Sequence, residues 1–184
     1  MNGPAAIENC LLIGNCGYFD GKFYTKHVDN CRAFGNSLEL ALRRGITVSV
    51  VNSTIVGHGD CLVGVGCDEN ATCDGSENII MQNNIFQGTN EFLNPSDTTC
   101  YIWFDQDNFY GTQIDYNIVY DAKIGSFGLA ANDIAQDPLF VDDNFESFNG
   151  HLQSSSPAID SGLAAGSLNG LIPTDDIEGN SRPL

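Results

Sequence analysis

Acidic side chains gather in one stretch of this chain, residues 59–78. Oxygen atoms carried by a loop are the ligands that calcium prefers in proteins. The candidate calcium ligands are Asp60, Asp68, Glu69 and Asp74. The window that starts at Asp68 departs from an EF-hand loop, because Cys73 stands where glycine is required and Ile79 where the closing glutamate belongs. The stretch therefore predicts either a calcium loop or an acidic, exposed loop closed by a Cys67–Cys73 disulfide.

Most of the few basic residues lie close together. Those within residues 22–44 are Lys22, Lys26, Arg32, Arg43 and Arg44, and His27 lies among them. Cationic side chains can neutralise the carboxylate of an acidic sugar, and one with a lowered pKa can act as a general base. We therefore take Lys26, His27 and Arg32 as candidate ligands for an anionic polysaccharide. The alternative is a set of solvated charges on a very acidic protein.

Aromatic side chains are concentrated farther along the chain, at Tyr101, Trp103, Phe104, Phe109, Tyr110, Tyr116 and Tyr120. Exposed aromatic rings can stack on sugar rings. This makes Tyr101, Trp103 and Tyr110 the candidate sugar-binding residues. In a strand, Tyr101 and Trp103 would share one face, and Ile102 and Phe104 the other, so one of these pairs is expected in the core. The alternative is that the aromatic residues pack internally.

Composition limits the partners of the protein. The formal net charge is −17, from 24 acidic and 7 basic residues, which argues against nucleic acid and anionic membrane surfaces. No apolar run reaches the roughly 18 to 20 residues of a membrane span. The 7 cysteines indicate an oxidising compartment, with an export signal farther upstream because the first ten residues carry none; the alternative is that they are reduced core residues. The 20 glycines and 6 prolines favour short strands and turns over helices.

The elements that position these residues are predicted by an internal repeat. Its copies are IENCLLIGN (7–15), VDNCRAFGN (28–36), VVNSTIVGH (50–58), MQNNIFQGT (81–89) and a weaker DYNIVYD (115–121). The repeated asparagines are Asn9, Asn30, Asn52, Asn83 and Asn117, and in the first four copies a glycine follows five positions later, at Gly14, Gly35, Gly57 and Gly88. Stacked solenoid coils place equivalent residues in columns. We therefore expect an asparagine ladder along the stack.

Two details follow from that alignment of the repeats. The glycines are expected to supply a positive φ at the next corner of each coil. Cys10 and Cys31 occupy the same position in successive copies, so we expect them to stack within disulfide range.

The segment NSLELALRRG, residues 36–45, fits two structures. Leu38, Leu40 and Leu42 alternate as in a strand. Asn36 and Glu39 would also suit a helix capping box. We prefer the strand, because a short coil leaves little room for a helix of this length.

The C-terminal part of the chain carries a series of short motifs. They are IDYNIVYD, NDIAQDPLFVDD, HLQSSSPAIDSG and PTDDIEGNSRP, with NNIFQG upstream. In their order and spacing over about residues 79–184 they resemble the end of secreted bacterial right-handed β-helix proteins of the pectate-lyase-like superfamily, in the group called choice-of-anchor Q domain proteins. The resemblance implies a fold and an extracellular setting but no activity, since only some branches of that superfamily are lyases or hydrolases.

The matching residues look structural. Pro138 and Pro157 would fix the chain direction, and Gly162 and Gly179 would allow turns. The polar residues of the motifs, Asp160, Asp176 and Arg182, would pair with one another or cap backbone groups.

Taken together, the sequence predicts an all-β protein, a right-handed parallel β-helix that is a single-stranded solenoid of about five coils. Residues 1–141 would form the coils, and residues 142–184 an irregular C-terminal tail that packs on or caps the last coil. The expected function is a noncatalytic module of a secreted or cell-surface protein that binds carbohydrate or acts as a scaffold. The alternative is a portion of a lyase or hydrolase acting on acidic polysaccharide. The first coil lacks a predicted cap, so we expect either missing upstream coils or self-association there.

Overall fold

The computed structural model describes residues 5–8, 10–13, 38–42, 44–57, 61–67, 74–88, 100–104, 112–122, 128–144, 147–176 and 178–181. Its strands are β1 (Ala5–Glu8), β2 (Leu11–Ile13), β3 (Leu38–Leu42), β4 (Thr47–Val51), β5 (Thr54–Gly57), β6 (Cys61–Cys67), β7 (Asn78–Gln82), β8 (Ile85–Gly88), β9 (Cys100–Phe104), β10 (Gln113–Asp115), β11 (Ile118–Tyr120), β12 (Phe140–Asp142) and β13 (Asn149–Leu152). One short helix, α1, spans Ser167–Gly170. No helix in the described part of the chain is long and apolar enough to cross a membrane.

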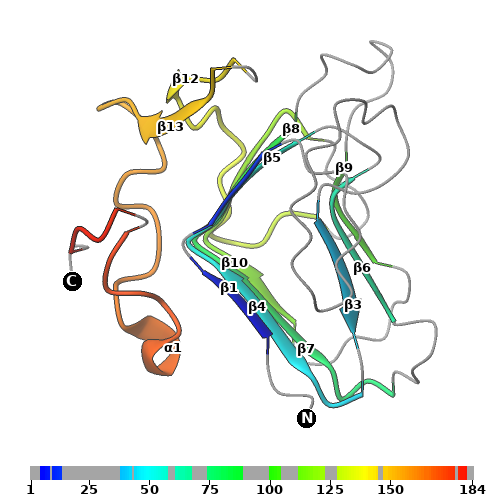
Figure 1. The fold of residues 1–184 in the computed structure, drawn as a ribbon. Helices are drawn as coiled ribbons and strands as arrows, with labels where there is room; N and C mark the ends of the chain where they lie inside the picture. The colour runs from blue at the N-terminus through cyan, green and yellow to red at the C-terminus, as the bar shows by residue number, and fades with distance from the viewer. Residues whose placement is uncertain are drawn as a thin grey trace.

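The strands form parallel sheets that the chain visits in turn (Figure 1). One sheet has the order β1-β4-β7-β10, a second β11-β8-β5-β2, and a third β3-β6-β9. Each of the first three passes adds one strand to each sheet, beside the strand of the previous pass, and the fourth adds β10 and β11 to the first two sheets. This is the arrangement of a parallel β-helix, with about four coils.

The number of coils is one fewer than the repeats predicted. β1 pairs directly with β4, and β2 with β5, so the copy at residues 28–36 does not form a coil between them. The neighbour of Cys10 in the next coil is Ser53, whose hydroxyl oxygen accepts the Cys10 N–H at 3.2 Å. The expected stacking of Cys10 on Cys31 in consecutive coils is therefore wrong in register, and Cys31 itself lies outside the described residues.

Residues 38–42 form strand β3, which confirms the preference for a strand over a helix. Leu40 and Leu42 are buried in the core. Their spacing of two residues fits a strand, in which alternate side chains face the same side. The hydrophobic alternation was therefore the stronger of the two local signals.

The core consists of apolar columns that run through the coils. In the first sheet, Ile7, Val50, Met81 and Ile114 follow one another in register, with exposures of 4, 0, 0 and 6%. In the second sheet, Ile55, Phe86 and Val119 form a similar column. Burying one such side chain stabilises a fold by about 1.5–3 kcal/mol. Because each column spans several coils, every coil depends on its neighbours for its core.

The bend between the first and second sheets has the same form in three coils. Its first residue adopts a left-handed backbone, with φ of 50° at Asn52, 58° at Asn83 and 59° at Tyr116. Asparagine tolerates this region better than most residues that have a side chain. The repeated asparagine is thus explained partly by the backbone of the bend.

The second residue of each bend builds a polar ladder inside the coils. The N–H of Ser53 donates to Oδ1 of Asn84, and the N–H of Asn84 to Oδ1 of Asn117, both at 3.0 Å. At the end of the ladder, Oδ1 of Asp133 accepts the N–H of Asn117 at 2.8 Å. A polar ladder therefore exists, but the predicted membership is wrong for Asn52 and Asn83, which occupy the preceding, left-handed position of each bend. Of the predicted asparagines that the structure describes, Asn117 belongs to the ladder.

The repeated glycines serve a different purpose from the expected one. Gly57 and Gly88 are register partners at the ends of β5 and β8, and neither has a positive φ. A Cβ added at Gly88 would overlap the carbonyl oxygen of Asp121 in the next coil. Gly88 is therefore required by the close approach of neighbouring coils, and the expected positive φ was wrong for it.

The C-terminal tail runs along the outside of the corner between the first and second sheets (Figure 1). β12 and β13 pair as an antiparallel hairpin, where Phe140 and Phe148 make an edge-to-face contact with ring centroids 4.9 Å apart. Farther along, Nδ2 of Asn83 donates to the carbonyl of Leu163 at 2.9 Å, and the Leu163 N–H donates to Oδ1 of Asn83 at 2.7 Å. These two hydrogen bonds attach the tail to a bend of the coils.

Candidate functional site

Asp74 is the one candidate calcium ligand that the structure describes, and it lies at a corner between coils. Its Oδ2 forms an ion pair with Nε of Arg44 at 2.7 Å. Its Oδ1 accepts hydrogen bonds from Oγ of Ser76 at 2.6 Å and from the Ser76 N–H at 3.2 Å. The Ser76 hydroxyl, the Ser76 N–H and the Arg44 charge lower the pKa of Asp74. Both of its carboxylate oxygens therefore already hold the corner together.

Glu77, which belongs to the same acidic stretch but is not one of the four candidate ligands, lies in the same corner. Its side chain is fully buried. Its two carboxylate oxygens accept the backbone N–H groups of Asp74 at 3.3 Å and of Gly75 at 2.9 Å. Buried carboxylates need such hydrogen bonds, because desolvation of the charge is otherwise costly. The turn-forming run Asp74-Gly75-Ser76 just before Glu77 was the sequence signal that could have identified this role.

The other candidate metal ligands cannot be placed against this corner. Asp60, Asp68 and Glu69 lie outside the described residues, as does Cys73 of the alternative disulfide loop. Within the described ranges, no group of three or more His, Cys, Asp or Glu side chains is arranged to hold a metal ion. The calcium loop stays a prediction.

Tyr101 and Trp103 lie on β9, in the third sheet. Ile102 is the register partner of Val63, and both are buried in the core. Tyr101 and Trp103 flank Ile102 along β9. Trp103 is the register partner of Gly64. The structure thus places these two candidates two positions apart on one strand, while Tyr110, Lys26, His27 and Arg32 lie outside the described residues.

A second polar cluster, which the sequence did not suggest, surrounds Tyr120 at the end of β11. The negative charge of Asp137 is the main reason that the pKa of the Tyr120 phenol lies above its ordinary value. Partial burial and the charges of Asp121 and Asp143 act in the same direction. The phenol is therefore held in its neutral form, as a hydrogen-bond donor beside carboxylates.

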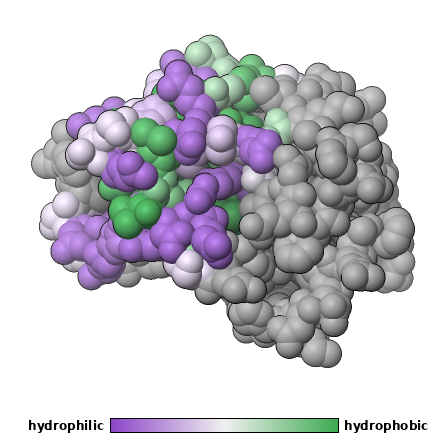
Figure 2. Space-filling view, turned by 90° about the horizontal axis from the view of Figure 1, so that it is seen from above, coloured by the Kyte–Doolittle hydropathy of each residue, from purple (hydrophilic) through white to green (hydrophobic). Residues whose placement is uncertain are grey.

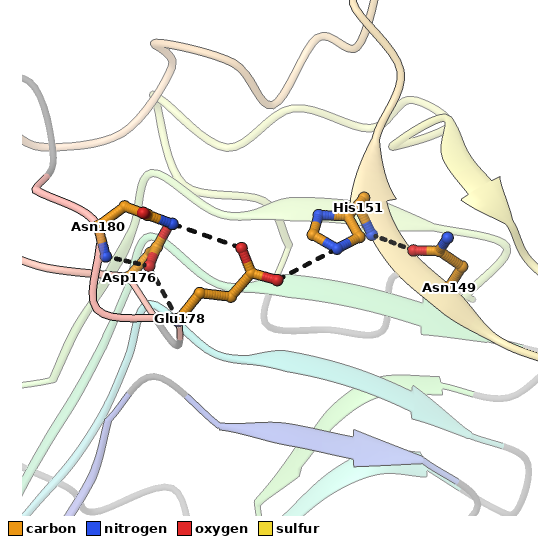
Figure 3. A network of polar contacts seen from close by, with 5 residues as sticks. All are labelled: Asn149, His151, Asp176, Glu178 and Asn180. Atoms are coloured by element: carbon orange, nitrogen blue, oxygen red, sulfur yellow. Dashed lines mark hydrogen bonds and ion pairs between the residues drawn. The ribbon is translucent and has the colours of Figure 1, made fainter.

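A third polar network joins the hairpin to the last loop of the tail (Figure 3). Nε2 of His151, on β13, lies 3.3 Å from Oε1 of Glu178, and both side chains are more than half exposed. Oδ1 of Asp176 accepts the N–H groups of Glu178 and Asn180, at 2.9 and 2.8 Å. Exposed pairs of this kind contribute little to stability. The network fixes a loop and shows no arrangement of groups for a reaction.

Seen from above, the described surface is mostly hydrophilic, with hydrophobic side chains between the polar ones (Figure 2). The large hydrophobic side chains that remain exposed are Leu11 at 42%, Val141 at 54% and Ile159 at 45%. Single exposed residues of this type are normal for a soluble surface.

The motif residues of the tail have structural contacts. Oδ1 of Asp137 accepts the Leu139 N–H at 2.8 Å, and the Ser156 hydroxyl donates to the carbonyl of Pro138. Gly179 has the positive φ expected of a turn, at 83°. Gly162 instead lies so close to Asn83 that an added Cβ would be 2.8 Å from Cγ of Asn83.

The polar motif residues differ in their roles. Asp176 caps backbone N–H groups as expected. Asp160 has a positive φ of 57°. Arg182 lies outside the described residues.

Comparison with known proteins finds no match: no family model, no curated protein and no solved structure is similar to this chain. The structure shows the architecture alone: a mostly β fold whose parallel sheets stack in register, as in a β-solenoid.

Proposed function

We propose that this chain is a noncatalytic β-helix module of a secreted or cell-surface protein, acting as a scaffold that presents a carbohydrate-binding face. The observation that carries this proposal is that the buried polar side chains form hydrogen bonds between coils. Asn84 and Asn117 are almost completely buried, and their amides bond from one coil to the next. At the exposed corner, the Asp74–Arg44 ion pair also joins neighbouring coils. Polar groups of this kind hold a stack of coils rigid.

The proposal includes membership of the pectate-lyase-like superfamily, in the choice-of-anchor Q group. This membership is supported by the structural contacts that the motif residues make in the tail. Asp137, Ser156 and Gly162 shape the tail and seat it on Asn83. An extracellular location follows from the same resemblance and from the seven cysteines.

The carbohydrate-binding face that we propose lies on the third sheet, around Tyr101 and Trp103 of β9. The two residues are spaced by two along β9, on either side of Ile102. Aromatic residues spaced by two along a strand lie in a row, and a row of rings suits a chain of sugar rings. An acidic protein with net charge −17 would take an anionic polysaccharide only where its basic residues or a bound cation offset that charge.

The test is binding and turnover on the same polysaccharides. The protein is titrated by calorimetry with pectate, alginate, chondroitin and a neutral glucan, with and without calcium, while absorbance reports unsaturated uronates. We expect binding without new absorbance. Trp103→Ala should weaken binding about tenfold, equivalent to about 1.4 kcal/mol, whereas Trp103→Phe, which keeps a ring, should retain most of it. Release of unsaturated uronates, or equal binding by wild type and Trp103→Ala, would overturn the proposal.

We also propose that the first coil is a contact surface for a second copy of the chain. β1, β2 and β3 each have a parallel neighbour on one side only among the described residues. An open strand edge is a template for pairing with another chain. Light scattering at increasing protein concentration tests this, and a monomer throughout would refute it.

A further inference from the structure

The third sheet brings two cysteines from different coils to the same level. Cys61 begins β6 and Cys100 begins β9, and they are register partners on these neighbouring parallel strands. Neighbouring strands lie about 4.7–4.9 Å apart. Disulfides form across Cα separations of about 4.4–6.8 Å. The spacing of the backbone at this position is therefore compatible with a bond between the coils.

The two cysteines also belong to the same face of the sheet. Two residues after them in each strand come Val63 and Ile102, which are register partners and are buried in the core. By the alternation of side chains in a strand, Cys61 and Cys100 share the face of Val63 and Ile102. The two cysteines therefore share both a register position and a face of the sheet.

The other cysteines on described strands or bends have different neighbours. Cys67, at the end of β6, is the register partner of Leu42. Cys10 donates its N–H to Ser53 in the next coil, and its own thiol is free. Among the described cysteines, Cys61 and Cys100 are thus the pair that the register brings together.

We propose that Cys61 and Cys100 form a disulfide that joins the second and third coils when the protein folds in an oxidising compartment. The oxidant is a low-molecular-weight disulfide such as oxidised glutathione. The Cys61 thiolate attacks one of its sulfurs, which forms a mixed disulfide and releases one small thiol. The Cys100 thiolate then attacks the Cys61 sulfur, which forms the bond between coils and releases the second thiol. The two cysteines lose two electrons and two protons, and the small disulfide gains both.

The proposal is tested on the full chain, refolded with and without oxidised glutathione, alkylated and cleaved after glutamate without reduction. Cleavage at Glu39, Glu69, Glu91 and Glu146 places Cys61 and Cys67 in the fragment 40–69 and Cys100 in the fragment 92–146. We expect these fragments to be joined, with tandem mass spectrometry locating the bond at Cys61. The link should persist in Cys67→Ser and disappear in Cys61→Ser.

Reduction should also lower the Tm of the wild type by roughly 5–10 °C more than that of Cys61→Ser, as expected for closing a loop of this size. The wild-type mapping does not depend on whether the variants fold. Alkylated Cys100 after oxidative refolding, or a bond from Cys100 to Cys67 or to any other cysteine, would overturn the proposal. None of these measurements depends on whether the protein binds carbohydrate.

Discussion

Replacing Asn83 with glycine should detach the C-terminal tail while leaving the coils folded. The φ of 58° at Asn83 is one that glycine adopts without strain, so the bend itself is preserved. The substitution removes the hydrogen bonds of 2.9 and 2.7 Å to the carbonyl and N–H of Leu163. At about 0.5–1.5 kcal/mol each, their loss favours local opening of the tail by about 1–3 kcal/mol.

The assay is native-state hydrogen exchange, read on peptides from the tail and from the coils. An opening free energy lower by about 1–3 kcal/mol corresponds to exchange roughly 5- to 150-fold faster for the Leu163 amide and its neighbours. Amides of β4 and β7, in the core of the stack, should keep their wild-type rates. The tail would then be a unit that opens separately from the coils.

Asn52→Gly is the matched control. Asn52 occupies the same position one coil earlier, with a φ of 50°. Its side-chain amide atoms are buried but have no hydrogen-bond partner among the described residues. Removing an unpaired buried amide relieves a desolvation penalty, so this variant should exchange no faster in the tail than wild type. Equal acceleration of tail exchange in the two glycine variants would refute the role assigned to Asn83.

Three further changes test other parts of the structure. Asn84→Ala removes a buried member of the polar ladder and should lower the free energy of unfolding by about 2–4 kcal/mol in urea titrations; a loss below about 0.5 kcal/mol would contradict the ladder. Because the pKa of Tyr120 is raised in the folded protein, wild type should lose stability as pH rises from about 10 through that pKa. Tyr120→Phe should not show this loss. Parallel alkaline denaturation curves for the two proteins would contradict the prediction. Because the folded pKa of Asp74 is lowered, its contribution is present above the ordinary carboxyl pKa and is lost as pH falls through the lowered value. Asp74→Asn should therefore flatten the acid side of the stability profile slightly, whereas an unchanged profile would argue against the lowered pKa of Asp74, which the Ser76 hydroxyl causes more than Arg44 does.

The sequence by itself determined the class of fold and much of its internal pattern. Alternating leucines predicted β3, and repeated asparagine and glycine predicted stacked coils with a polar ladder. These signals are local, since they depend on the period of a strand and on the backbone preferences of a bend.

Only the tertiary structure decided which repeats become neighbours. The copy at residues 28–36 matches the pattern, yet β1 pairs with β4. Asn83 hydrogen-bonds to the tail, whereas the adjacent Asn84 belongs to the polar ladder. A shift of one residue moves a side chain to the other face, and spacing alone does not resolve such a shift.

The candidate sites show the same division. Composition identified Asp74 as one of a group of acidic residues, but its partner Arg44 belongs to the preceding coil, and the contact exists only because the corners stack. The surroundings of Tyr120 combine β11 with the start of the tail, so no single motif contains them. Contacts between coils depend on the length of the loops that separate the strands, and loop length changes from coil to coil without altering the repeat itself.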